Sequence, residues 1–194
     1  MTLNNGNLYI SFPLDFYVDS SSTNEGGTKF YPYTSIQKAL DEINKLNDGS
    51  STFTIILKSN CSPDVSTEEK AKNVYSKDTN FSYLNLCSEK TLNLVIKSDE
   101  ESSNQYSINA VSPGPQISHR AIYVGENVNL TLDNVQICGG TCTATNESDG
   151  ATNGAGLYLS QNSTCIIKNG TSINSNTTTS NGGGIYNEGA CAER

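Results

Sequence analysis

Apolar positions near the start of the chain recur at helical spacing and later gather into short runs. One face of residues 34–48 carries apolar side chains three or four positions apart: Ile36, Ala39, Leu40, Ile43 and Leu46. Thr34 followed three residues later by Gln37 matches a capping box, and Gly49 follows the last apolar turn. The pattern predicts an amphipathic helix over about residues 34–48.

Two β-branched runs bounded by polar residues follow this helix. Residues 51–60 read STFTIILKSN, and residues 90–99 read KTLNLVIKSD. Such runs are typical of short strands. Because the helix must cover its apolar face, we expect it to cap the open N-terminal end of a stack of strands.

Three segments in the second half of the chain share one pattern, in which an apolar residue precedes a tyrosine. The apolar positions are Ile122, Leu157 and Ile185, and the tyrosines are Tyr123, Tyr158 and Tyr186. The tyrosines are 35 and 28 residues apart. The longer interval contains residues 141–153, TCTATNESDGATN, which we expect to form an exposed loop that tolerates shortening. Periods of about 20 to 50 residues indicate stacked repeats.

Short strands in repeats of this length predict an all-β fold, a parallel β-helix in which each coil pairs with the next. Glycines precede the repeated strands, where a tight corner needs positive φ: Gly154, Gly156, Gly182, Gly183 and Gly184. We expect one domain over 1–194, with an N-terminal cap (1–60), irregular coils (61–118) and Gly/Asn-rich coils (119–194). After Tyr186 only NEGACAER remains, so we expect an incomplete final coil that continues into further coils or self-associates end to end.

Residues 172–187, SINSNTTTSNGGGIYN, resemble the repeats of the polymorphic membrane protein family of surface adhesins. That family pairs Phe-x-x-Asn with Gly-Gly-Ala-Ile/Leu/Val. Ile173 and Asn176 match the first element with Ile in place of Phe, and residues 182–185 match the second with Gly in place of Ala. Residues 154–157 are a looser copy, and residues 16–43 resemble the opening of pectate-lyase-like proteins. The resemblance implies a right-handed parallel β-helix at the cell surface or secreted, which binds a host surface protein or a carbohydrate.

The composition is rich in Asn, Ser, Thr and Gly, with only 16% charged residues and a net charge of −8. An acidic chain repels phosphate backbones, so we expect no nucleic-acid partner. No run approaches the roughly 18 apolar residues of a membrane helix, and the first residues lack a signal-peptide pattern. We therefore expect no transmembrane segment, and no export signal is visible in the sequence.

Pectate-lyase-like proteins include lyases and glycosidases, so an enzymatic interpretation has to be weighed. A glycosidase needs two carboxylates at a fixed separation, but the repeats offer Asp133 on a strand and other acids in turns. His119 beside Arg120 is a candidate base for a lyase, although a satisfied surface pair is the simpler interpretation. We assign no catalytic residue. A partial or degenerate carbohydrate-active enzyme and a structural spacer stay as alternatives to a non-enzymatic adhesin.

Six cysteines and one histidine offer little for metal binding, because CGGTC at residues 138–142 is not a C-x2-C pair. We expect no metal and no cofactor. The repeat alignment places Cys191 over Cys165, in the column that holds Leu130 one coil earlier. A disulfide and a pair of thiols are equally open there. The tyrosine column could bind sugar rings or a partner strand, but stacking between coils also explains it and is favoured.

Overall fold

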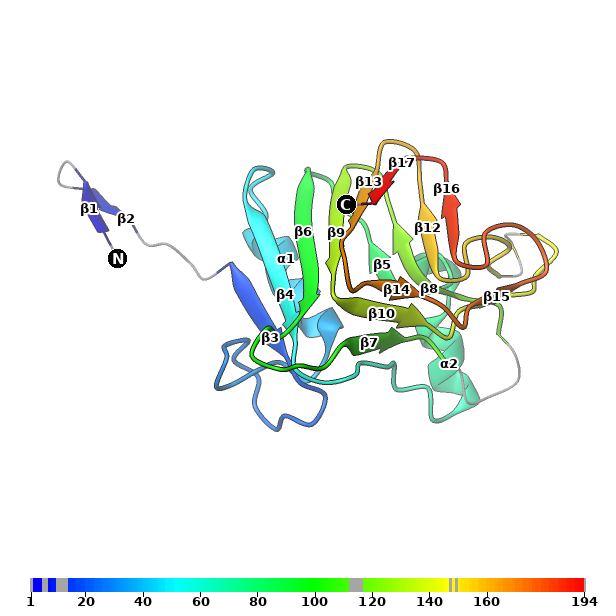
Figure 1. Ribbon diagram of the computed structural model, residues 1–194, viewed down its shortest axis with the longest axis horizontal. Helices are drawn as coiled ribbons and strands as arrows, with labels where there is room; N and C mark the ends of the chain where they lie inside the picture. The colour runs from blue at the N-terminus through cyan, green and yellow to red at the C-terminus, as the bar shows by residue number, and fades with distance from the viewer. Residues whose placement is uncertain are drawn as a thin grey trace.

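The protein is largely β, with strands in parallel sheets and two short α-helices (Figure 1). The computed structural model describes residues 2–4, 7–9, 14–111, 117–146, 148 and 150–193. The largest sheet has six parallel strands: β3 (Asp15–Val18), β4 (Thr52–Leu57), β6 (Leu92–Ser98), β9 (Val128–Asp133), β13 (Thr164–Ile167) and β17 (Ala190–Glu193). The expected strands in residues 51–60 and 90–99 are thus confirmed as β4 and β6, which pair with each other.

Three smaller parallel sheets accompany the six-stranded one. A four-stranded sheet contains β5 (Ser82–Leu86), β8 (Arg120–Val124), β12 (Leu157–Leu159) and β16 (Ile185–Asn187). A three-stranded sheet contains β7 (Tyr106–Asn109), β10 (Val135–Cys138) and β14 (Ser172–Ile173), and β11 (Thr141–Cys142) pairs with β15 (Thr177–Thr178). At the N-terminus, β1 (Thr2–Asn4) and β2 (Asn7–Tyr9) form an antiparallel pair.

The chain visits these sheets in turn. From β6 it runs through β7 and β8, and it returns to the six-stranded sheet as β9 beside β6. The next circuit, through β10, β11 and β12, returns as β13 beside β9. We call each such circuit a passage. Equivalent residues of successive passages are therefore neighbours across the sheets.

Alternating side chains of these strands build the interior. Strands β6 and β9 alternate strictly between buried and half-buried residues, as expected for strands with one apolar face. The buried residues align in columns across the six-stranded sheet, such as Phe53, Leu94, Leu130 and Cys165. Full burial of one such aliphatic side chain contributes roughly 1.5–3 kcal/mol.

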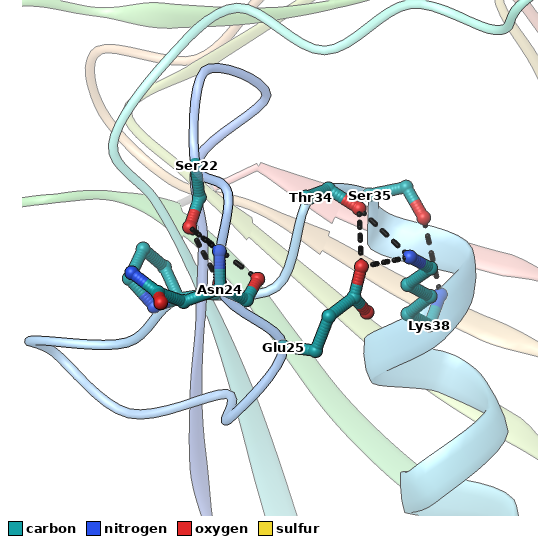
Figure 2. Close-up of polar contacts among 7 residues, drawn as sticks. Ser22, Asn24, Glu25, Thr34, Ser35 and Lys38 are labelled. Atoms are coloured by element: carbon teal, nitrogen blue, oxygen red, sulfur yellow. Dashed lines mark hydrogen bonds and ion pairs between the residues drawn. The ribbon is translucent and has the colours of Figure 1, made fainter.

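The helix expected near residues 34–48 exists as α1 (Ile36–Leu46), with a corrected N-terminal cap. Ser35, not Thr34, has the extended backbone of the cap and accepts a hydrogen bond from the Lys38 amide. The Thr34 hydroxyl instead contacts Lys38 Nζ and Glu25, as Figure 2 shows. Gln37 donates to Asp41 further along the helix, so the expected capping box is absent.

The apolar face of α1 packs against the first strands of the six-stranded sheet. Four of the five expected apolar side chains are buried: Ile36, Ala39, Leu40 and Ile43. They belong to the same core cluster as the buried residues of β3 and β4, which α1 contacts directly. The core therefore continues from the sheets into the helix.

The exposed loop expected over residues 141–153 is present in part: Thr145, Asn146 and Ser148 are exposed, residues 147 and 149 lie outside the described residues, and both ends are packed. Thr141 and Cys142 form strand β11, and Cys142, Ala151 and Ala155 form a buried cluster. The Ser118 hydroxyl donates to the Ala151 carbonyl and accepts from the amides of residues 143 and 144. Both ends of the segment are thus part of the packed structure, and shortening it across Ala151 would remove core contacts.

The tight corners between strands use asparagine and glycine with positive φ. Asn127 (φ 63°) and Asn162 (φ 59°) occupy equivalent corners of successive passages, and Asn127 N donates to the Asn162 carbonyl. Asn134 (φ 52°) precedes strand β10, and Gly170 (φ 82°) occupies the equivalent corner before β14 in the next passage. Asparagine tolerates the left-handed region better than other residues with a Cβ. The corners thus require the residue types that dominate the composition.

We predict that Leu40→Asp destabilises the protein by about 3 kcal/mol or more, because it places a charge in the packed contact between α1 and the sheet. Asn44→Asp is the matched control, since it adds the same charge on an exposed position of the same helix. Chemical denaturation should show Asn44→Asp within about 0.5 kcal/mol of wild type. Equal stability of Leu40→Asp and wild type would contradict a helix that closes the core.

Candidate functional site

The tyrosine column exists in the predicted register on strands β8, β12 and β16. Tyr158 pairs with Tyr123 on one side and with Tyr186 on the other. Ile122 and Leu157 in the neighbouring column are fully buried, so the three tyrosines lie on the opposite, outer face of the sheet and are half-buried. The column therefore lies on the outer face of the four-stranded sheet, whose strands β8, β12 and β16 are labelled in Figure 1.

The tyrosine rings stack on one another. The ring centroids of Tyr123 and Tyr158 are 5.2 Å apart, and those of Tyr158 and Tyr186 are also 5.2 Å apart. The Arg120 guanidinium lies over the Tyr158 ring at 4.5 Å from its centroid, a cation–π contact. The Tyr123 and Tyr186 rings and the Arg120 guanidinium therefore cover the Tyr158 ring. The geometry accounts for the repeat of tyrosine by stacking between strands.

His119 and Arg120 are buried rather than forming the surface pair that the sequence suggests. Arg120 donates to the carbonyls of Asn80 and Asn153 at 2.8 Å each. The His119 ring nitrogens lie against the carbonyls of Ile117 and Gly139, and its ring stacks on Tyr75 with centroids 4.0 Å apart. Burial lowers the pKa of His119, although those carbonyls favour the charged form. Both side chains are satisfied, as the simpler interpretation expects, but inside the protein and not at its surface.

Of the five glycines before the repeated strands, the structure requires three and leaves room for a side chain at two. Gly154 (φ 67°) and Gly182 (φ 68°) have left-handed backbone, which glycine adopts without a side-chain clash. Gly156 needs its lack of a side chain for space, because a Cβ there would lie 2.5 Å from the Gly184 carbonyl oxygen. Gly183 and Gly184 have room for a Cβ, with nearest atoms at 3.5 and 3.8 Å. The structure therefore requires glycine at the first three positions only.

An exposed aromatic pair in the loop of residues 19–34, which we name the Phe30 loop, is a feature that the sequence analysis missed. Phe30 is 83% exposed and Tyr31 is 59% exposed, the two highest values among the exposed large hydrophobic residues. The run KFYPY at residues 29–33, apolar within a polar loop, is the signal that could have identified it. Exposed aromatic residues of this kind are typical of interaction surfaces.

Hydrogen bonds hold the Phe30 loop in one conformation. At its base, Tyr17 N donates to the Gly27 carbonyl and Tyr33 N donates to the Tyr17 carbonyl, at 2.9 and 2.8 Å. Near its tip, Tyr31 and Thr28 exchange backbone hydrogen bonds of 3.2 Å. Gly27 has φ 66°, and a Cβ there would lie 2.3 Å from the Tyr33 ring, so the loop turns where only glycine fits.

Ion pairs tie the Phe30 loop to the rest of the protein. Glu25 pairs with Lys38 of helix α1, and the Ser22 hydroxyl accepts from the Asn24 amide beside it (Figure 2). On the other side, Lys29 Nζ lies 2.5 Å from Glu101 Oε1. The Phe30 side chain is thus presented on a fixed support.

A cleft of about 620 Å³ lies beside helix α2 (Glu68–Val74), a short helix that the sequence analysis did not predict. Its lining combines Lys72 and hydroxyls with apolar side chains, including Phe81 and Ile117. Phe81 has φ 50°, a conformation that is rare for an aromatic residue. The described lining residues include no carboxylate, the group that most glycoside hydrolases use in pairs.

Among the described residues, no cluster of three or more His, Cys, Asp or Glu side chains could hold a metal ion. None of the described helices is long and apolar enough to cross a membrane. Comparison of the chain with protein-family models, with curated proteins and with solved structures gives no match. The functional interpretation therefore rests on the geometry of the chain itself.

We predict that alanine lowers the stability of the protein at Gly156 but is tolerated at Gly184 in the next passage. Gly156→Ala should destabilise the protein by about 1–3 kcal/mol, because its Cβ collides with a backbone carbonyl. Gly184→Ala, where there is space, should change stability by less than about 0.5 kcal/mol. Urea denaturation of both variants tests this difference, and equal effects would contradict the close contact between the passages.

We also predict a loss of stability above pH 10 that depends on Tyr158. Burial, together with Glu188, raises the pKa of Tyr158 to about 12. A phenol with a higher pKa in the folded state stabilises the fold fully below its unfolded pKa near 10. This contribution is lost as pH rises toward 12. The free energy of unfolding should fall less steeply over this window in Tyr158→Phe than in wild type, and equal slopes would contradict the prediction.

Proposed function

We propose that this chain is a non-enzymatic, right-handed parallel β-helix segment of a cell-surface or secreted protein, which binds a partner as an adhesin passenger does. The pairing of equivalent strands in successive passages supports a β-helix. Crossover connections between parallel strands are right-handed in nearly all proteins, which supports the handedness. The glycine and asparagine corners add to the resemblance of residues 172–187 to adhesin repeats.

The observation that carries the binding role is the 83% exposure of Phe30 on an anchored loop. Moving a large apolar side chain from water into a partner's apolar pocket is favourable, because its apolar surface is removed from water. Because hydrogen bonds already fix the loop, binding orders few additional groups. Aromatic anchors of this kind often dominate the binding energy of an interface.

The surroundings of Phe30 favour a protein as the partner. An apolar pocket on a protein would bury the whole Phe30 ring, which is 83% exposed in the free protein. The neighbouring Lys29–Glu101 ion pair supplies a polar rim around this apolar centre. An apolar centre with a polar rim is the usual arrangement of a protein interface.

The contacts of the basic residues weigh against the enzymatic alternative. A lyase requires an accessible base, but His119 is buried and held against backbone carbonyls. Arg120 is 3% exposed and lies over the Tyr158 ring. These two side chains are committed to the packing of the sheets, which supports a binding role over catalysis.

We predict that the purified chain binds saturably to cultured host cells and that Phe30→Ala weakens this binding at least about tenfold. Val111→Ala is the matched control, because Val111 is an exposed apolar residue outside the loop and its variant should bind as wild type does. Binding is measured by flow cytometry, and circular dichroism checks that each variant is folded. Protease treatment of the cells should abolish binding if the partner is a protein.

Four outcomes would contradict this proposal. Absence of saturable binding by wild type would favour the spacer interpretation. Equal binding by Phe30→Ala and wild type would exclude the Phe30 loop as the binding surface. Turnover of neutral or acidic polysaccharides, followed by reducing ends and by absorbance of unsaturated products, would favour an enzyme. Binding that survives protease but not glycosidase treatment would exclude a protein partner.

A further inference from the structure

Two cysteines occupy adjacent positions in one interior column of the six-stranded sheet. The column runs through Leu94, Leu130, Cys165 and Cys191, and Cys165 on β13 is in direct register with Cys191 on β17. The predicted alignment of Cys191 over Cys165 is thereby confirmed. Neighbouring parallel strands lie about 4.8 Å apart, within the Cα separation of roughly 4.4–6.8 Å that a disulfide spans. Both side chains leave the same face of the sheet, because in-register residues of parallel strands point the same way.

The two thiols differ in accessibility. Cys165 is 1% exposed, because Leu130 and Cys191 flank it in the column, whereas Cys191 is exposed. Burial raises the pKa of Cys165 to about 12, and Cys191 contributes to this shift through a contact between the two side chains. An oxidant in solution can therefore reach Cys191, and Cys165 can be reached through Cys191.

The other cysteines in paired positions face different residue types. Cys61 lies opposite Ile108, Cys138 lies opposite Asn109, and Cys142 lies opposite Thr178. Within the strand pairings that the structure describes, Cys165 and Cys191 are thus the one cysteine pair in register. The arrangement distinguishes these two from the remaining four cysteines of the chain.

We propose that Cys165 and Cys191 form a disulfide bond that fastens strand β17 to strand β13. Oxidised glutathione, or another small disulfide, is the oxidant. The Cys191 thiolate attacks one sulfur of that disulfide, its S–S bond breaks, and one reduced glutathione leaves. The Cys165 sulfur then attacks the Cys191 sulfur of the mixed disulfide and expels the second glutathione. Two electrons pass to the reagent, and the two thiol protons end on the two glutathione molecules.

The bond would close a loop that contains β14, β15 and β16, and so would hold a whole passage onto the one before it. Cross-links of this kind stabilise mainly by restricting the unfolded chain. Disulfides persist in extracellular surroundings, where the proposed function places the protein, but the bond itself requires only an oxidant. The inference therefore stands or fails independently of partner binding.

The test oxidises the folded chain with oxidised glutathione, stops the reaction with acid and alkylates the remaining thiols in denaturant. Trypsin combined with a protease that cleaves before aspartate separates Cys165 from Cys138 and Cys142, because Asp133, Asp149 and Lys168 lie between or beside them. Mass spectrometry should find the Cys165 and Cys191 peptides joined, with Cys138 and Cys142 alkylated. Reduction should release the two peptides.

Two serine variants provide matched controls. Cys191→Ser should leave Cys165 alkylated, whereas Cys87→Ser, which removes another exposed cysteine, should retain the cross-link. Oxidation should raise the Tm of wild type and of Cys87→Ser by roughly 5–10 °C and leave that of Cys191→Ser unchanged. Recovery of Cys191 as a stable glutathione adduct, or joined to Cys191 of a second chain, would overturn the proposal.

Discussion

The in-register pairing of parallel strands is the constraint on which the rest of the structure depends. Each residue in a paired strand lies beside its equivalent in the next passage, so like residues form columns. Asn129 donates to the Asn93 side chain at 2.9 Å and accepts from Thr164 at 2.7 Å, which forms a polar ladder on the outer face of the six-stranded sheet. The stacked tyrosines and the apolar interior columns follow from the same register. Because one register fixes all of these columns, a shift by one residue would exchange the inner and outer faces of a strand.

Some backbone carbonyls at the corners have no hydrogen-bond donor on a neighbouring strand. Buried side chains donate to these carbonyls instead. The Arg120 guanidinium reaches the carbonyls of Asn80 and Asn153, one on each side of its own strand in the sequence. The Tyr75 hydroxyl donates to the Ala110 carbonyl. A buried carbonyl without a donor costs roughly 1–3 kcal/mol, so these polar side chains are part of the fold. Arg120, which the sequence places beside a candidate base, is here a structural hydrogen-bond donor.

Periodicity explains which parts of the structure could be predicted from the sequence. The alignment of Tyr123, Tyr158 and Tyr186 and that of Cys165 with Cys191 were correct, because repeats preserve register and register fixes neighbours. The apolar face of α1 was also correct, but its cap was placed one residue early because Thr34 and Ser35 are both competent hydroxyl caps. The burial of Ala151 depends on contacts between segments outside the repeat, which no local spacing encodes. The candidate binding surface at Phe30 was missed because the run KFYPY at residues 29–33 lies outside the repeats and has no strand or helix period.

The abundance of asparagine has a structural cause, which bears on the Asn-x-Ser/Thr triplets of the chain. These triplets begin at Asn60, Asn80, Asn129, Asn146, Asn162, Asn169 and Asn176. Asn162, in one such triplet, occupies a corner with φ 59°. The Asn129 amide is used in the ladder on the six-stranded sheet. The Asn176 amide donates to the carbonyls of Ile137 and Asn174, and its carbonyl oxygen accepts from Gly140 N. A side-chain amide that donates to one carbonyl of the preceding passage and to one of its own is a poor acceptor for a glycan, because attachment would break at least one of those bonds. At these three positions the asparagine therefore has a structural role in a corner or a ladder. Such amide contacts also satisfy polar groups in a chain with only 16% charged residues.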